Sequence, residues 1–164
     1  MAWASAEVKV RLPGLTRMRA DLTKDGPVRK RILTRWAFRY RVFAERRFIK
    51  FSRGGGDWPA LTSKRRRGAT SAAAILRNTG LLLGALSPKV KAPGSIAKHQ
   101  GFSVMVGYGG AEAHADGGGA TIADIARFHQ TGAGHLPVRK VVVPPDRAFI
   151  RMMAQDAVII LEKG

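Results

Sequence analysis

Residues 28–51 read VRKRILTRWAFRYRVFAERRFIKF, and this stretch decides the fold. Its apolar residues recur at helical spacing with no glycine or proline among them, which predicts one long helix from Val28 to Phe51. The preceding Asp25-Gly26-Pro27 is typical of a helix start, because proline is tolerated at the first helical position. One apolar stripe, predicted to face the protein's own core, consists of Ile32, Leu33, Trp36, Ala37, Tyr40, Phe43, Ala44 and Phe48.

A second apolar row lies on another face of this predicted helix. It consists of Phe38, Val42 and Ile49. The side chains between the two rows are basic: Arg31, Arg35, Arg39, Arg46 and Lys50. Because a contiguous exposed apolar row is uncommon, we expect the second row to be covered by another chain or by the C-terminal helix.

The remaining segments alternate between strand and helix patterns. Strands are predicted over Ala6–Leu12, Gly101–Gly107 and Arg139–Val143. Helices are predicted from Leu15 to Leu22, over Ser71–Arg77, Leu81–Leu86 and Ile122–Phe128, and from Arg147 to about Leu161 with Asp146 as the cap. Glycine-rich stretches predict flexible loops at about residues 53–70 and 109–120.

This order of elements predicts a single α+β domain over residues 1–164. We expect a small, mostly antiparallel sheet, with the long N-terminal helix and a C-terminal helix packed on it. The core is predicted to bring the strand residues Val8, Val10, Val104 and Val106 together under the Ile32–Trp36–Tyr40 stripe.

Composition narrows the class of protein. The 164 residues include no cysteine, which excludes disulfides, thiolate zinc sites and cysteine nucleophiles. No apolar run approaches the roughly 20 residues of a membrane span, and Met1–Leu12 does not resemble a signal peptide. We therefore expect a protein that acts in the cytoplasm, or in a particle assembled there, and that does not bind a membrane.

Positive charge is concentrated in one part of the chain. The net charge is +18, and residues 17–77 contain 18 Lys/Arg against 4 Asp/Glu, a net of +14. The sharpest basic run is Lys64-Arg65-Arg66-Arg67. Such a block needs an anionic partner or counter-ions, and the candidate partners are nucleic acid, an acidic protein surface or an anionic membrane.

No pattern typical of a catalytic or metal site is found. His99, His114, His129 and His135 show neither helical i,i+4 spacing nor an HExxH motif, so we predict loop or surface positions for them. Neither glycine triplet has the context of a phosphate-binding loop. We predict no catalytic residue, metal or cofactor. The candidate site is an interface: Arg31, Arg35, Phe38, Arg39, Val42, Arg46, Ile49, Lys50, Trp58, Lys64, Arg65, Arg66 and Arg67.

Several short motifs occur in a definite order from about Phe51 to Pro144. They are Phe51, Gly54 and Trp58 with Leu61 and Thr62; Ile75, Leu76, Thr79, Gly80 and Leu82; Val104, Val106 and Gly107; and Ile125, Ala126, His129, Gln130 and Gly132, followed by Pro137 and Arg139. In this order the chain resembles the virion-morphogenesis, or tail-completion, family of tailed bacteriophages. It departs from the family's Pro-Ala-Arg-Pro-Phe pattern, since residues 137–141 read PVRKV.

The resemblance implies a structural protein of the virion neck or tail, without catalytic residues. Such a tail-completion or tail-terminator subunit would form a homo-oligomeric ring, with six copies favoured and twelve as the alternative, and would join head to tail. Neighbouring neck and tail proteins would be its partners. Because the basic residues lie beside apolar rows, we expect contact with DNA to be secondary. Two alternatives stay open. A nucleic-acid-binding protein explains the charge but not the second apolar row. An enzyme such as a nuclease or wall hydrolase lacks a recognisable site.

Overall fold

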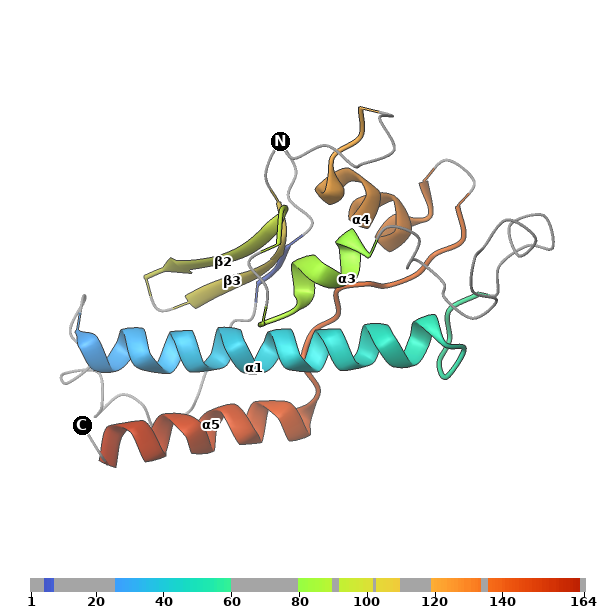
Figure 1. Cartoon of the computed structure of the whole chain (residues 1–164). Helices are drawn as coiled ribbons and strands as arrows, with labels where there is room; N and C mark the ends of the chain where they lie inside the picture. Colours follow the sequence, from blue (N-terminus) through green and yellow to red (C-terminus); the bar gives the residue numbers. More distant parts are fainter. Residues whose placement is uncertain are drawn as a thin grey trace.

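The computed structural model describes residues 5–7, 26–59, 80–89, 92–101, 103–109, 119–133 and 136–162. The elements in chain order are β1 (Ser5–Glu7), α1 (Pro27–Ser52), α3 (Leu81–Leu86), β2 (Ser95–Gln100), β3 (Ser103–Tyr108), α4 (Ile122–Thr131) and α5 (Arg147–Glu162). Figure 1 shows a small sheet beside a long helix that runs the length of the molecule. The predicted α+β class is confirmed, and so are the long N-terminal helix and the C-terminal helix.

The sheet is antiparallel, with strand order β1-β3-β2. β2 and β3 form a hairpin in which Ser95 lies opposite Tyr108 and Gln100 opposite Ser103. Gly101 in the connection has a φ of +54°, a conformation that favours glycine. The predicted second strand is confirmed as β3. β2 was not predicted, because its last four residues are all exposed and produce no alternation of apolar and polar side chains.

The core forms where α1 crosses the sheet. Ile32, Trp36 and Tyr40 are buried, as are Val104 and Val106 of β3, in one hydrophobic cluster. This part of the predicted core is confirmed. The predicted partners Val8 and Val10 lie outside the described residues, as do the helices predicted over residues 15–22 and 71–77.

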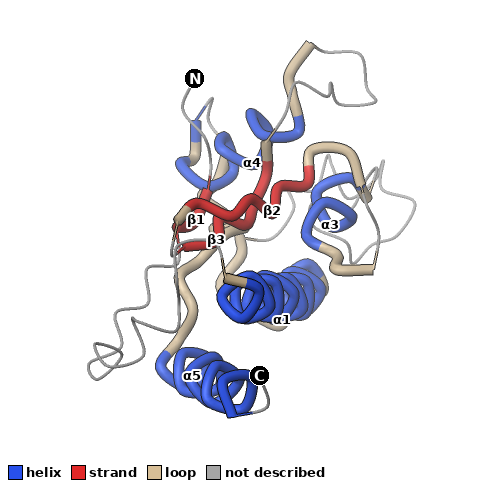
Figure 2. Tube along the Cα trace, turned by 90° about the vertical axis from the view of Figure 1, so that its left-hand side faces the viewer, coloured by secondary structure: helices blue, strands red, loops and turns tan. Residues whose placement is uncertain are grey.

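α5 packs on α1, on the side away from the sheet (Figure 2). The indole Nε1 of Trp36 donates a hydrogen bond to the carbonyl of Met153 at 2.9 Å, and the ring of Phe43 lies 5.1 Å from that of Phe149. The C-terminal helix therefore contacts the long helix rather than the sheet, because α1 buries side chains on two sides. The predicted cap is confirmed: Asp146 Oδ1 accepts from Phe149 N at 2.8 Å.

α1 ends in a tight turn. Gly54 has a φ of +83°, and a Cβ at Gly56 would lie 2.3 Å from the ring of Phe51, so only glycine fits there without a shift. The turn returns Trp58 to the core, edge-on to Phe48 at 5.1 Å. Residues 53–55 of the predicted flexible loop thus belong to a hydrogen-bonded turn at the end of α1. Residues 60–70 of that loop, and residues 110–118, lie outside the described part.

The strand predicted over Arg139–Val143 is wrong. The segment has no strand structure, because its backbone groups are hydrogen-bonded to α4 and to side chains of α1. Arg139 N donates to the carbonyl of His129 at 2.7 Å. The Gln130 side chain donates to the carbonyl of Val142 at 2.8 Å and accepts from Val142 N at 3.1 Å. One amide side chain thus takes the place of a neighbouring strand.

Gln130→Ala is expected to lower the free energy of unfolding by about 1–3 kcal/mol, because it leaves two polar groups of the buried Val142 without these bonds. Gln130→Glu should also lower this free energy, since a carboxylate still accepts from Val142 N but faces the Val142 carbonyl oxygen with a negative charge and cannot donate to it. Urea unfolding measures both, with Thr131→Ala on the exposed neighbouring residue as the control. Equal stabilities for Gln130→Ala and Thr131→Ala would show that the two hydrogen bonds between Gln130 and Val142 contribute nothing to stability.

Candidate protein-interaction surface

α1 has a third face that the rest of the described chain covers only in part. The side chains of Phe38, Val42 and Ile49 lie within an arc of about 40° at 100° per residue. Phe38 is 48% exposed, and Val42 and Ile49 are half-buried. The sheet and α3 occupy one side of α1 and α5 occupies another. We call Phe38, Val42 and Ile49 the outward row. α5 does not cover Phe38.

Basic side chains flank the outward row. Arg31, Arg35, Arg46 and Lys50 are all exposed. The structure therefore brings together most of the interface residues that the sequence predicts. Two described residues are exceptions: Trp58 is buried in the chain's own core, and Arg39 is hydrogen-bonded to Asp156 of α5. The run Lys64–Arg67 lies outside the described residues.

Other basic residues of α1 hold the fold together. Arg47 Nη1 donates to the carbonyl of Lys140 at 2.6 Å, and its guanidinium lies 4.1 Å from the centre of the Phe51 ring. Arg41 Nη2 reaches the carbonyl of Ala85 in α3 at 3.4 Å. Burial lowers the pKa of both guanidinium groups. These two arginines have a structural role and do not belong to the candidate surface.

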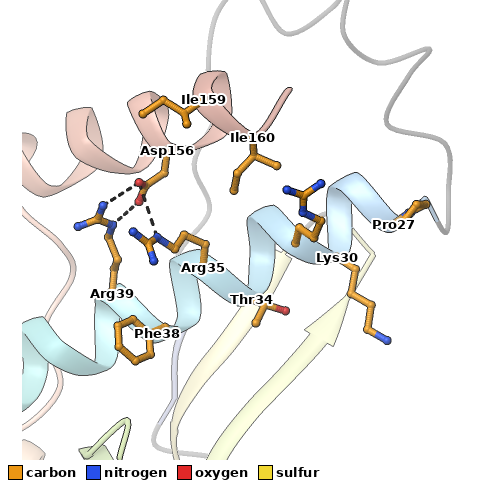
Figure 3. A pocket seen from close by; sticks show the side chains of 10 residues that line it. Pro27, Lys30, Thr34, Arg35, Phe38, Arg39, Asp156, Ile159 and Ile160 are labelled. Atoms are coloured by element: carbon orange, nitrogen blue, oxygen red, sulfur yellow. Dashed lines mark hydrogen bonds and ion pairs between the residues drawn. The ribbon is translucent and has the colours of Figure 1, made fainter. Parts of the chain in front are cut away.

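A groove of about 890 Å³ opens between the first half of α1 and the last turns of α5 (Figure 3). Its lining consists of Pro27, Lys30, Arg31, Thr34, Arg35, Phe38, Arg39, Asp156, Ile159 and Ile160. Phe38 and Ile159 are each 48% exposed. The sequence predicted the α1 side of this groove and missed the α5 side. The run Val158-Ile159-Ile160-Leu161 is the feature that could have indicated it, because one helix face cannot bury four consecutive apolar residues.

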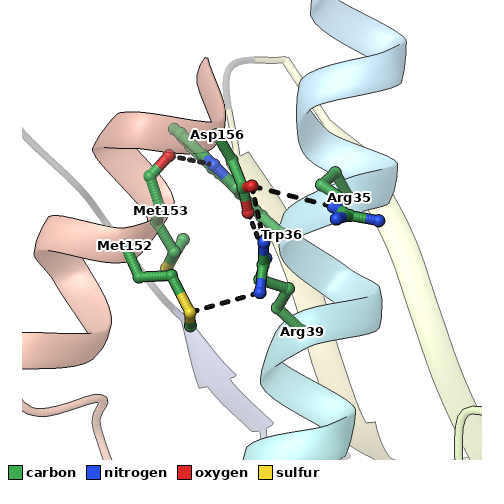
Figure 4. A network of polar contacts seen from close by, with 6 residues as sticks. All are labelled: Arg35, Trp36, Arg39, Met152, Met153 and Asp156. Carbon is green, nitrogen blue, oxygen red and sulfur yellow. Dashed lines mark hydrogen bonds and ion pairs between the residues drawn. The ribbon is translucent and has the colours of Figure 1, made fainter. Parts of the chain in front are cut away.

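Asp156 is the only acidic residue of this lining, and it is already paired (Figure 4). Its carboxylate accepts two hydrogen bonds from the Arg39 guanidinium, the one from Nη2 at 2.7 Å, and Arg35 Nε lies 3.8 Å away. Arg39 also contacts the sulfur of Met152 at 3.2 Å. The hydrogen bond with Asp156 raises the pKa of the Arg39 guanidinium. The groove therefore keeps a positive charge from Lys30, Arg31 and Arg35.

Asp156→Ala is expected to lower the free energy of unfolding by about 1–3 kcal/mol, because two arginines then face each other without a carboxylate. Arg39→Ala combined with Asp156→Ala should recover part of this loss. The coupling in the double-mutant cycle should be about 1 kcal/mol and should fall in high salt, since the Arg39 side chain is 30% exposed. Additive effects of the two substitutions in urea unfolding would contradict the pairing.

His129 is buried, so the surface position predicted for it is wrong. Ile122, Ala126 and His129 follow one another at helical spacing and form the buried face of α4. His99 is exposed on β2, whereas His114 and His135 lie outside the described residues. Within the described ranges, no group of three or more His, Cys, Asp or Glu side chains could hold a metal ion.

None of the helices described is long and apolar enough to span a membrane.

Comparison with protein-family models, with curated proteins and with solved structures finds no match. Several residues of the short motifs from Phe51 to Pro144 lie in the described part of the fold. Trp58, Leu82 and Val106 are core residues. Gly80 and Gly132 have φ values of +71° and +78° at the ends of helices. These motif residues thus serve packing and turns.

Proposed function

We propose that this protein is a non-enzymatic structural subunit of a tailed-bacteriophage particle that binds neighbouring protein subunits through the outward face of α1. One observation carries the proposal. A helix of 26 residues presents an apolar row with the exposed Phe38 and the half-buried Val42 and Ile49, and exposed arginines flank it. Because α1 is packed on its other sides, this face is held in place before any partner arrives.

The composition of this face favours a protein partner. Protein interfaces are enriched in aromatic residues and arginine, and their buried centres are depleted of charge. The outward row, with the aromatic Phe38, supplies such a centre. Arg31, Arg35 and Arg46 supply a charged rim. A surface that bound only phosphate would not need the apolar row.

The place in the particle comes from the resemblance of the motifs to the tail-completion family. In this proposal the subunit forms a ring at the neck or tail end, completes the tail and joins it to the head, and is part of the virion. Six copies are favoured and twelve are the alternative. Since basic faces repel each other, the outward face must meet a different surface of the next subunit or of a neighbouring neck or tail protein.

Nucleic acid binding is the second candidate, and the charge of α1 favours it. The helix contains nine Lys/Arg and one acidic residue, Glu45. Lys30, Arg31, Arg35, Arg46 and Lys50 are exposed and could reach phosphates. Arg39, Arg41 and Arg47 are engaged within the protein. We therefore place DNA contact second to protein contact.

A nonsense mutation in the gene, made in a phage genome that carries it, tests the proposed role. The lysate should contain filled heads and separate tails under the electron microscope, and adding the purified protein should restore joined particles. Duplex DNA binding by the purified protein, measured over a salt series, should be weak at about 0.15 M salt. Normal particles from the mutant would refute the proposed role. Tight, steeply salt-dependent DNA binding would favour the second candidate.

A further inference from the structure

We propose that the groove between α1 and α5 binds an acidic, amphipathic helix of another protein. The apolar face of the bound helix would lie on Phe38, Ile159 and Ile160, and its carboxylates would pair with the basic rim. This inference goes beyond the proposed role in a phage particle, because the chemistry of the groove specifies this ligand whatever assembly the chain belongs to.

The apolar floor of the groove is the first ground for this proposal. Phe38 of α1 and Ile159 of α5 are among the four large hydrophobic side chains most exposed to solvent in the described part of the chain. Both line the same groove, together with Ile160. Exposed apolar residues that gather in one concave place, with a polar rim, are typical of a binding site rather than of the general surface.

Charge decides which partner fits. The lining holds Lys30, Arg31, Arg35 and Arg39 against Asp156 alone, which Arg39 already binds. An acidic ligand therefore complements the rim, because its carboxylates can pair with the guanidinium and ammonium groups of the lining. A second copy of this chain fits poorly, because its net charge is also +18.

The shape of the groove favours a helix as the occupant. α1 and α5 lie side by side and run in opposite directions (Figure 1). The α1 residues that line the groove extend from Pro27 to Arg39, which spans about 18 Å at 1.5 Å per residue. A helix of about three turns matches this length. Its apolar residues at i, i+3, i+4 and i+7 would lie on the floor, as in other helix-in-groove complexes.

The test uses a fluorescein-labelled helical peptide of 14 residues, with leucines along one face and glutamates on either side. A second peptide has the same composition, but its leucines are scattered around the helix. Fluorescence anisotropy at about 0.15 M salt, a level at which long-range charge attraction is largely screened, should show that the full-length protein binds the first peptide at least tenfold more tightly. If both peptides bind equally, attraction is due to charge alone and the proposal is wrong.

Two variants with matched controls locate the site. Ile159→Asp should weaken binding of the first peptide at least tenfold, whereas Val138→Asp, at a residue equally exposed but outside the groove, should not. Arg31→Glu should weaken it similarly, whereas Arg151→Glu on the exposed part of α5 should not. Circular dichroism checks that all four variants are folded. The proposal fails if each control weakens binding as much as its partner variant, or if duplex DNA displaces the peptide and binds equally to the Ile159→Asp variant.

Discussion

Phe48→Ala is expected to lower the free energy of unfolding by about 3–5 kcal/mol, whereas Phe38→Ala on the same helix should change it by less than about 1 kcal/mol. Phe48 is 1% exposed and lies edge-on to Trp58, with ring centres 5.1 Å apart. Its removal leaves a cavity beneath the turn that ends α1. Phe38 is 48% exposed, so its removal leaves no cavity.

Urea unfolding followed by circular dichroism and by tryptophan fluorescence measures both variants. The two substitutions remove the same atoms from the same helix, so helix propensity is matched and only burial differs. The comparison also bears on function, because a large apolar side chain that adds little stability is better explained by binding. A loss for Phe38→Ala as large as that for Phe48→Ala would mean that Phe38 belongs to the core and not to the outward face.

Phe38→Asp combined with Ile49→Asp is expected to abolish head–tail joining while leaving the protein folded. Two carboxylates in the outward row would have to be desolvated in any apolar contact, and a buried unpaired charge typically costs several kcal/mol. A loss of that size lowers the affinity of an interface by at least a hundredfold. The measurement adds purified variant to separated heads and tails and counts joined particles.

The control for this experiment is Val138→Asp, which adds a carboxylate at another exposed apolar position, away from α1. It should support joining as the unaltered protein does. Thermal unfolding of both variants excludes simple destabilisation. Full joining by the doubly substituted protein would remove the outward row from the proposed interface and would leave the arginines as the remaining candidates.

Much of the candidate site could be predicted from the sequence, because it lies on one helix. The spacing of Phe38, Val42 and Ile49 and the arginines between the apolar rows are local features, and the helix that carries them requires no distant contact to be recognised. The groove could not be predicted. Asp156 and Ile159 join it from more than a hundred residues further along the chain, and only the packing of α5 on α1 brings them beside Arg39 and Phe38.

The sequence alone determined the two large helices, β3 and the Asp146 cap, since each depends on a local period, on a cap or on the absence of glycine and proline. The tertiary structure decided the rest. It placed α5 on α1 instead of on the sheet, buried His129, formed β2 from residues without clear alternation and gave Val142 the Gln130 side chain in place of a strand. Hydrogen bonds within a helix connect residues four apart, and the sequence displays that spacing. A strand needs a partner, and the packing of distant segments determines which partner it finds.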